Sequence, residues 1–376
     1  MIRFISPQQY ATYTPPDNPQ ARAVYQYVKP FIEKGSRALI HNVDTEVWLA
    51  QIDDILLPVT KNTAQYENSY VCSLYTHYIS YCKEEMNIVG IGGLKYLFAP
   101  LLGLLGWMAK RAQMNKVVIL NNFMLSTNLY VPISKMQYQE LMWAAQKQFP
   151  GFLIAFRSLN EDYNATALAD LISLGGHKIA SRRVYLLKPE NIRSCAKKLL
   201  RKDENAKQAK NYCWVSASLA DVPDINQFYE ALYLKKYSRL NPQFTQLFYR
   251  HILQNALFRV RMLRQGAKNR GVCGLFVHGC GATAPIFGYA SNSTTQDALY
   301  RVLSLWGWEM IQDKEPLNIN FSSGVSLFKR ARGAVGRTEY TVLFYNHLSI
   351  GRRWFWKWFT GFINRVALPI MIWKRY

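Results

Sequence analysis

The sequence predicts an α/β chain with mixed sheets, made of two successive domains and a basic, tryptophan-rich helix at the C-terminus. Strand-length apolar runs alternate with helical patterns along the chain. The order of these elements in residues 212–348 follows the order in residues 1–192. The charged segment 193–211, which contains KKLLRKDENAKQAK, predicts a linker helix between the two halves.

The first half begins with a polar lead-in and a helix at 19–33, after which strands and helices alternate. Ser134 suits a helix N-cap, and Gly175 and Gly176 suit a helix stop. The predicted strands are 36–42, 46–60, 116–120, 152–156 and 181–187, and the predicted helices are 73–86, 134–149 and 164–174.

Residues 88–114 form the most apolar region of the chain. The run 96–109, YLFAPLLGLLGWMA, carries no charge, but it is short for a bilayer span and contains Pro100. Lys110 and Arg111 follow it, and Trp107 suits an interfacial depth. Two interpretations stay open, an interfacial helix and a buried core helix.

The second half begins with two predicted helices and continues with a three-stranded meander. A helix, a strand, a short basic helix and a last strand follow. The predicted helices are 224–234, 242–253 and 297–312, and the predicted strands are 258–263, 271–278, 284–290, 317–321 and 339–344.

Residues 318–345, NINFSSGVSLFKRARGAVGRTEYTVLFY, read as a strand, a polar turn, a basic helix start and a strand. A polar turn that leads into a helix presents backbone N–H groups to an anion. With EYTVLFYNHL and Arg352-Arg353, the pattern NxNFSSGxxxFKRxRG resembles the C-terminal part of the GNAT superfamily, the acyl-CoA N-acyltransferase fold. The most similar type is the large tandem form related to the Fem-type aminoacyl transferases.

The resemblance implies two GNAT-like domains in tandem, of which the second is catalytic and the first degenerate. It covers about residues 210–353 by motif, and the first half only by element order. It places acyl transfer where two central strands diverge, between 286–290 and 317–321. Backbone N–H groups near 289–292 would polarise the reacting carbonyl.

The catalytic candidates are Asn320, Tyr345 as acid for a leaving thiolate, and His347 as general base. Tyr345 and His347 also suit packing at a strand end. The candidates for donor binding are Tyr289, Ser291, Ser293, Thr294, Thr295, Ser322, Lys329 and Arg330. The candidates for acceptor contact are Tyr237, Ser238, Asn241 and Thr245, although their segment also suits a plain helix–loop–helix turn.

One departure from the family pattern concerns the donor. The segment SNSTTQDALYR (291–301) stands where these enzymes usually carry a Q/R-x-x-G-x-G/A loop for the CoA pyrophosphate. We therefore expect no tightly bound cofactor. The expected co-substrate is an acyl thioester, as acyl-CoA or, more in keeping with the missing loop, on an acyl carrier protein. Aminoacyl-tRNA is the alternative donor.

Composition points to anionic partners. The net charge is +22 with a pI near 9.7, and residues 231–296 contain no acid at all. An acidic carrier protein, an anionic membrane and tRNA all fit this balance. The six cysteines form no CxxC, and P-loop, GxGxxG and GxSxG patterns are missing, so we expect no metal site, nucleotide fold or serine hydrolase.

The segment 349–376 holds four tryptophans and six basic residues without an acid, which is typical of an interfacial anchor. The alternative is a helix packed on the sheet. Because MIRFISPQQY lacks the apolar core of a signal peptide, we expect a cytoplasmic protein, peripheral on the inner face of the membrane.

Three hypotheses follow. The first is an acyltransferase that moves an acyl group from a carrier thioester to an amine. The second is a Fem-type transferase that uses aminoacyl-tRNA. The third is a non-catalytic, basic, membrane-peripheral binding protein, because a fold does not establish a function.

Overall fold

The computed structural model describes residues 2–88, 94–188, 190, 194–291, 293–310 and 318–369. In this part of the chain, twelve strands form one continuous mixed sheet. The first six are β1 (Ile2–Ile5), β2 (Glu46–Ile52), β3 (Ile55–Asn62), β4 (Val117–Leu120), β5 (Leu153–Leu159) and β6 (His177–Leu187). The second six are β7 (Tyr212–Ser216), β8 (Phe258–Gln265), β9 (Lys268–His278), β10 (Gly281–Tyr289), β11 (Asn318–Asn320) and β12 (Val335–Phe344).

The strand order is symmetric. It runs β1-β2-β3-β4-β5-β12-β6-β11-β10-β9-β8-β7. Each strand of the first half has as its counterpart the strand numbered six higher, and the two stand at equal distances from the centre of the sheet. The pairing directions match too, because β4·β5 and β10·β11 are parallel whereas the other neighbours are antiparallel. The two halves are therefore related by an approximate two-fold axis, which is normal to the sheet and passes between β12 and β6.

The helices repeat as well. They are α1 (Pro19–Glu33), α2 (Ser36–Leu39), α3 (Tyr81–Ile88), α4 (Leu94–Arg111), α5 (Lys135–Gln148), α6 (Ala165–Ser173), α7 (Ser194–Ala209), α8 (Val222–Tyr229), α9 (Gln246–Leu253), α10 (Leu299–Glu309), α11 (Ser326–Ala331) and α12 (Ile350–Phe362). Helices α1 and α2 correspond to α8 and α9, α5 to α10, and α6 to α11. Each half therefore has the element order of the GNAT fold, which confirms the predicted tandem α/β architecture.

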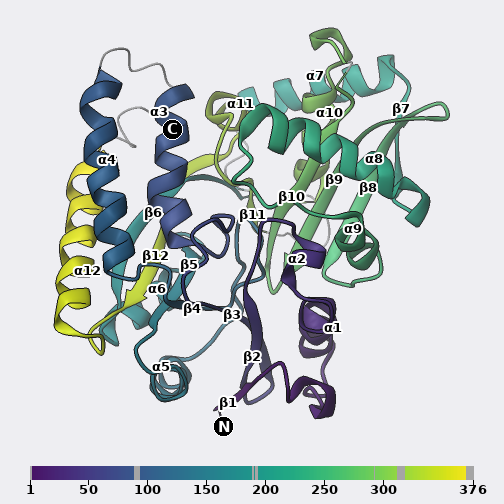
Figure 1. Cartoon of the computed structure of the whole chain (residues 1–376). Helices are drawn as coiled ribbons and strands as arrows, with labels where there is room; N and C mark the ends of the chain where they lie inside the picture. The colour runs from purple at the N-terminus through teal and green to yellow at the C-terminus, as the bar shows by residue number, and fades with distance from the viewer. Residues whose placement is uncertain are drawn as a thin grey trace.

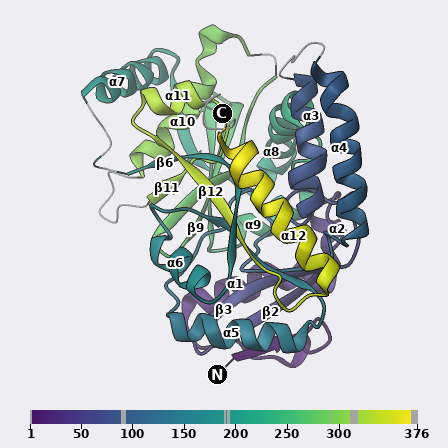
Figure 2. The same ribbon diagram turned by 90° about the vertical axis from the view of Figure 1, so that its left-hand side faces the viewer.

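Helices cover both faces of the sheet (Figures 1 and 2). Along β2, Val47 and Leu49 pack with α1, whereas Trp48 and Ala50 pack with α5, as the two-residue period of a strand requires. One face carries α1, α2, α8 and α9 together with α3, α4 and α12. The other carries α5, α6, α7, α10 and α11.

The two halves exchange their last strands. Strand β12 lies between β5 and β6, pairing Phe344 with Ile154 and Val335 with Leu186. Strand β6 in turn lies between β12 and β11. Neither half therefore completes its own sheet. The boundary at 193–211 stays a prediction, and α7 fills most of that segment, of which residue 193 lies outside the described residues.

Four elements differ from the sequence prediction. The predicted strand 46–60 is a hairpin of β2 and β3, because the chain turns at Asp53, which has φ 49°. Residues 36–39 form α2 rather than a strand, because Gly35 turns the chain with φ 80° and the Ser36 hydroxyl bonds the main chain of Thr45 at 2.9 and 3.1 Å. Strands β1 and β7 were not predicted at all. Both are edge strands of four or five residues, too short for a clear periodicity.

A buried ion pair joins the exchanged strands. Arg182 of β6 and Glu339 of β12 are direct neighbours in the register, and their Nε and Oε1 atoms lie 2.8 Å apart. The Glu339 side chain is 3% exposed. Arg182 also donates to the Thr127 hydroxyl at 3.0 Å, so it ties the loop after β4 to the centre of the sheet.

We expect Glu339→Ala to lower the free energy of unfolding by about 3–5 kcal/mol, because it leaves the Arg182 charge buried without its partner. Urea denaturation measures this loss. The control is Glu161→Ala, which removes the exposed 3.4 Å pair with Lys178 and is expected to cost at most about 1 kcal/mol. Equal losses in the two variants would contradict the central role of the buried pair.

A second expectation concerns acid. His278 at the end of β9 is buried against Phe123 and Phe276, and burial lowers its pKa to about 4. Between pH 6.5 and 4 the unfolded chain binds a proton at this position that the folded chain does not. The free energy of unfolding therefore decreases as the pH is lowered through this range, by up to about 3 kcal/mol. Urea titrations of His278→Phe across this range are expected to show a shallower slope by one proton. An unchanged slope would contradict the assignment.

Candidate active site

Strands β10 and β11 part where the resemblance predicts. They pair only over Gly281–Thr283 and Asn318–Asn320, whereas β10 continues to Tyr289. An irregularity in β10 between Thr283 and Ile286 accompanies the divergence. Residue 317, part of the predicted strand, lies outside the described residues.

Asn320 stabilises this strand end. Its Oδ1 accepts a hydrogen bond of 2.8 Å from the Ser322 N–H, and its main-chain oxygen accepts one of 2.9 Å from the Thr283 hydroxyl. Ser322 takes a left-handed conformation with φ 58°. The divergence is thus held open by a tight polar turn.

The structure separates the three predicted catalytic residues. Asn320 is level with Leu186 and Val335 in the sheet, and Tyr345 follows Val335 by ten positions along β12. At about 3.3 Å per residue, Tyr345 lies roughly 33 Å from Asn320. Asn320 therefore shares no site with Tyr345 or His347.

Tyr345 and His347 have packing roles at their end of the sheet. Tyr345 stacks on His177 with ring centroids 4.2 Å apart. His347 Nε2 donates to the Phe152 carbonyl at 2.7 Å, and burial lowers the pKa of its imidazole. The prediction of an acid and a base at these two positions is corrected accordingly.

Lys329 supports the turn rather than facing a donor. Its ammonium donates to the carbonyls of Phe321, Ser322 and Ser323 at 2.7, 3.3 and 2.8 Å. Burial and then the Arg182 charge lower its pKa to about 7, whereas three carbonyl acceptors favour the charged form. The neighbouring Arg330 is half-buried, and its Nε has no hydrogen-bond partner among the described residues.

In the segment after β10, hydrogen-bond donors that could bind a phosphate are already bonded within the segment. The N–H and the hydroxyl of Thr294 both bond Asp297 Oδ2, at 2.8 and 3.3 Å, and Asp297 lies 3.6 Å from Arg270. Thr294 thus caps the 3₁₀ turn 295–297, and a carboxylate occupies the position expected for a phosphate. Ser293 donates its N–H to Ala290 at 3.2 Å, and Ser291 and Thr295 are exposed.

Two of the four predicted acceptor residues line a cavity of about 760 Å³. Tyr237 and Ser238 form one wall, and Glu84 of α3 lies opposite with its carboxylate bonded to the Ser238 hydroxyl. The remaining lining residues are His41, Glu230, Leu234, Lys235, Arg239, Gln243 and Phe244. The cavity therefore combines two carboxylates with basic and aromatic groups from both halves of the chain.

The other two predicted acceptor residues hold the loop in shape. Asn241 is buried and donates to the carbonyls of Tyr233 and Ser238 at 3.1 and 3.0 Å. Thr245 caps α9 by accepting from the Phe248 N–H at 3.3 Å. Neither residue lines the cavity, so the helix–loop–helix interpretation describes these two positions.

Residues 230–237, which carry Tyr237 of the cavity wall, pack against β10, the longer of the two diverging strands. The Tyr237 phenol is close enough to Tyr289, at the end of β10, that Tyr289 adds to the rise in the pKa of Tyr237 caused mainly by burial. Both phenols act in the same sense on Tyr300 of α10, whose pKa burial raises strongly. A predicted donor residue and a predicted acceptor residue thus lie together, with Tyr300 as a third member that sequence reasoning missed.

The corresponding divergence in the first half is filled. Strand β5 continues past its last pair with β4, Phe156 with Leu120, and the next residue is Arg157. This arginine is 4% exposed and donates to the carbonyl of Val71 at 2.8 Å and to Asn122 Oδ1 at 3.3 Å. Side chains of the chain itself thus occupy the opening.

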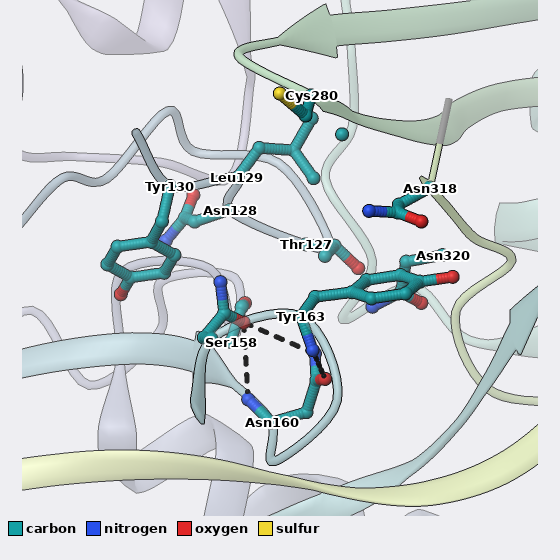
Figure 3. A pocket seen from close by; sticks show the side chains of 12 residues that line it. Thr127, Asn128, Leu129, Tyr130, Ser158, Asn160, Tyr163, Cys280, Asn318 and Asn320 are labelled. Carbon is teal, nitrogen blue, oxygen red and sulfur yellow. Dashed lines mark hydrogen bonds between the residues drawn. The ribbon is translucent and has the colours of Figure 1, made fainter. Parts of the chain in front are cut away.

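A small polar cavity of about 70 Å³ lies beside that filled opening (Figure 3). Residues of both halves line it, among them Ser158 near the end of β5, Asn160 directly after β5, and Asn318 and Asn320 of β11. The Ser158 hydroxyl is buried without a hydrogen-bond partner in the described part of the chain. The space is large enough for water molecules but too small for an acyl chain.

No protein-family model matches the sequence, and no curated protein does either. Among solved structures, a conserved protein of unknown function from Bacteroides thetaiotaomicron is 12% identical, with 91% of this chain and 99% of that chain covered and a TM-score of 0.49. A tandem GNAT protein from the clavulanic acid biosynthesis pathway is 9% identical, with 91% and 98% covered and a TM-score of 0.38.

L-PGS from Bacillus licheniformis is 12% identical, with 57% of this chain and 74% of that chain covered and a TM-score of 0.44. Proteins of the GNAT fold are thus among the structural neighbours. The repeated strand order of the chain itself carries the assignment of the fold.

We expect Lys329→Met to lower the free energy of unfolding by about 2–4 kcal/mol, because the three carbonyls at the divergence lose their shared donor. Urea denaturation measures the loss, and amide hydrogen exchange of residues 321–325 is expected to speed up. The control is Lys198→Met on the exposed side of α7. Its free energy of unfolding is expected to stay within about 0.5 kcal/mol of that of the unmodified protein. If Lys329→Met behaves like this control, Lys329 does not hold the turn.

Proposed function

We propose that this protein is a GNAT-type acyltransferase whose second half moves an acyl group from a carrier thioester to an amine. The observation that supports this best is the junction at which residues 230–237, including Tyr237 on the wall of the 760 Å³ cavity, pack against β10, the strand that diverges from β11. Acyl transfer requires a thioester carbonyl and an amine side by side, and this junction offers a place for each.

The acceptor in this proposal enters as a cationic amine. Glu84 and Glu230 are the carboxylates on the cavity wall, and both attract an ammonium group. The amine must lose a proton before it attacks, and Glu84 and His41 are the groups at the cavity that can accept one.

The proposed reaction forms one bond and breaks one. The amine nitrogen attacks the thioester carbon, the C–S bond breaks, and the leaving thiolate takes a proton. The Tyr237 phenol on the cavity wall is the candidate acid, because a phenol is protonated at neutral pH. The Ala290 N–H already donates to the Arg270 carbonyl at 3.0 Å, which leaves the Ser291 N–H as the candidate for polarising the reacting carbonyl.

A carrier protein suits the donor side better than free CoA. Thr294 spends its N–H and hydroxyl on Asp297, whose carboxylate would repel a pyrophosphate. Lys235 and Arg239 at the cavity and the net charge of +22 favour the acidic surface of an acyl carrier protein. Ser322 and Arg330, at the turn that follows β11, stay candidates for contact with the donor.

Aminoacyl-tRNA is the second candidate donor, supported by the acid-free stretch 231–296. Its binding would weaken steeply with salt, because each neutralised phosphate releases counterions. A peripheral location on the inner membrane face remains part of the proposal. Among the described residues, no helix combines the length and apolarity that crossing a bilayer requires.

The test incubates purified protein with an amine mixture and, in turn, acyl-carrier protein, acyl-CoA and aminoacyl-tRNA, with mass spectrometry of the products. We expect acyl transfer from the carrier protein. Tyr237→Phe is expected to lower kcat about 10²-fold, and Glu84→Gln with Glu230→Gln to raise KM for cationic amines at least tenfold and to lower kcat as well. His347→Gln is the matched control, within twofold of the unmodified protein.

Transfer from tRNA alone would replace the first donor by the second. Transfer that survives Tyr237→Phe but not His347→Gln would move the reaction to the other end of the sheet and contradict this site. An absence of transfer from all three donors would favour a non-catalytic binding protein.

A further inference from the structure

Helices α4 and α12 lie on one side of the molecule, at the left of Figure 1 and facing the viewer in Figure 2. Arg352, in the first turn of α12, donates to the carbonyls of Ala112 and Gln113 directly after α4, at 3.0 and 3.3 Å. The C-terminal end of α4 and the N-terminal end of α12 are therefore tied together.

Each helix buries one stripe and exposes another. Leu105 and Ala109 of α4 share a core with Phe355, Trp356 and Phe359 of α12. The opposite stripes expose large apolar side chains, which are Leu101, Leu104, Trp107, Ile350, Trp354 and Trp358, and Val366 is exposed in the π-helical turn Ile363–Ala367 that continues α12. These seven are half of the fourteen exposed large hydrophobic residues found in the described part of the chain, so such residues are concentrated on this side of the molecule.

The charged residues of the two segments that carry these side chains have one sign. Exposed basic side chains alternate with the apolar ones, and they are Lys110, Arg111, Arg353, Lys357 and Arg365. Residues 94–116 and 345–369 contain no Asp or Glu. The α4–α12 face, as we call these apolar and basic residues together, is therefore apolar and cationic.

We propose that the α4–α12 face docks on an anionic lipid surface. Solvated apolar side chains in a patch of this kind indicate a partner. Trp107 and Trp354, 61% and 69% exposed beside arginines, match the amphipathic side chains that prefer the depth of lipid headgroups. The surrounding cations attract anionic headgroups, each contributing about a fivefold gain in affinity.

Other partners fit the charges less well. A second copy paired through the same face would bring arginines and lysines of one chain against those of the other. Nucleic acid would leave the seven apolar side chains without a partner. A bilayer takes up both kinds of side chain at once.

This inference does not depend on the proposed reaction. Helix α3, which contacts α4, carries Glu84 of the acceptor cavity. Docking would therefore bring the cavity near the lipid headgroups.

The test is co-sedimentation with vesicles of phosphatidylcholine, with or without 30% phosphatidylglycerol, at two salt concentrations. We expect at least tenfold tighter binding to the anionic vesicles. Trp107→Ala with Trp354→Ala is expected to weaken it at least tenfold. Arg353→Gln with Lys357→Gln is expected to weaken it about 25-fold and to reduce its salt dependence.

The chain provides a matched control on another surface. Trp143 of α5 is 68% exposed, with Lys147 lying 5.3 Å from its ring centroid. Trp143→Ala with Lys147→Gln is expected to bind vesicles within twofold of the unmodified protein. Equal loss in this control, equal binding to both vesicle types, or no binding would each overturn the proposal. So would a dimer in sedimentation equilibrium that Trp107→Ala with Trp354→Ala abolishes.

Discussion

The pairing of β6 with β12 is the constraint on which the rest of the structure depends. These two strands lie at the centre of the sheet, and each belongs to the opposite half of the chain from its outer neighbour. Their shared ladder extends from Val335 with Leu186 to Leu343 with His177, and the ion pair of Arg182 with Glu339 lies within it. Since this ladder fixes the two divergences relative to one another, the geometry of the candidate site depends on it as well.

The two halves have kept one fold and treated its opening differently. In the first half, Arg157 and Asn122 fill the space beyond β4. In the second, the turn held by Lys329 stays polar, and residues 230–237, which contribute to the wall of an open cavity, pack against β10. Because one of the two equivalent openings is filled, the two halves differ although their strand order is symmetric. The first half also contributes to the cavity beside the second half, because His41 and Glu84 line it.

Periodicity and turn residues predicted most of the central elements, since the buried strands are strongly apolar and glycine, proline and polar caps mark their ends. They did not predict β1 and β7, because a short edge strand buries too few side chains to leave a pattern. The exchange of β6 and β12 was also beyond reach, because the apolar alternation of a strand does not say which neighbour it pairs with. Only the three-dimensional pairing distinguishes these arrangements.

The site was predicted in part for a similar reason. The family resemblance implied the divergence near Asn320 and the loop that carries the cavity residues Tyr237 and Ser238. It could not associate them with Glu84, which is far away in the chain and reaches the cavity through packing of α3. Sequence reasoning also grouped His347 with Asn320, because both follow or end a strand. Asn320 is level with the first residue of β12, however, whereas His347 lies beyond the last residue of β12.

The strand exchange also bears on how the chain is made. Strand β5 is complete at Leu159, but its inner neighbour β12 ends only at Phe344, 185 residues later (344 − 159). At about 5–20 residues per second, a ribosome needs roughly 10–40 s to synthesise that interval. During this time β5 presents an unpaired apolar edge, the kind of template on which other chains aggregate. Production of this protein should therefore respond to slower translation and to chaperones that shield strand edges.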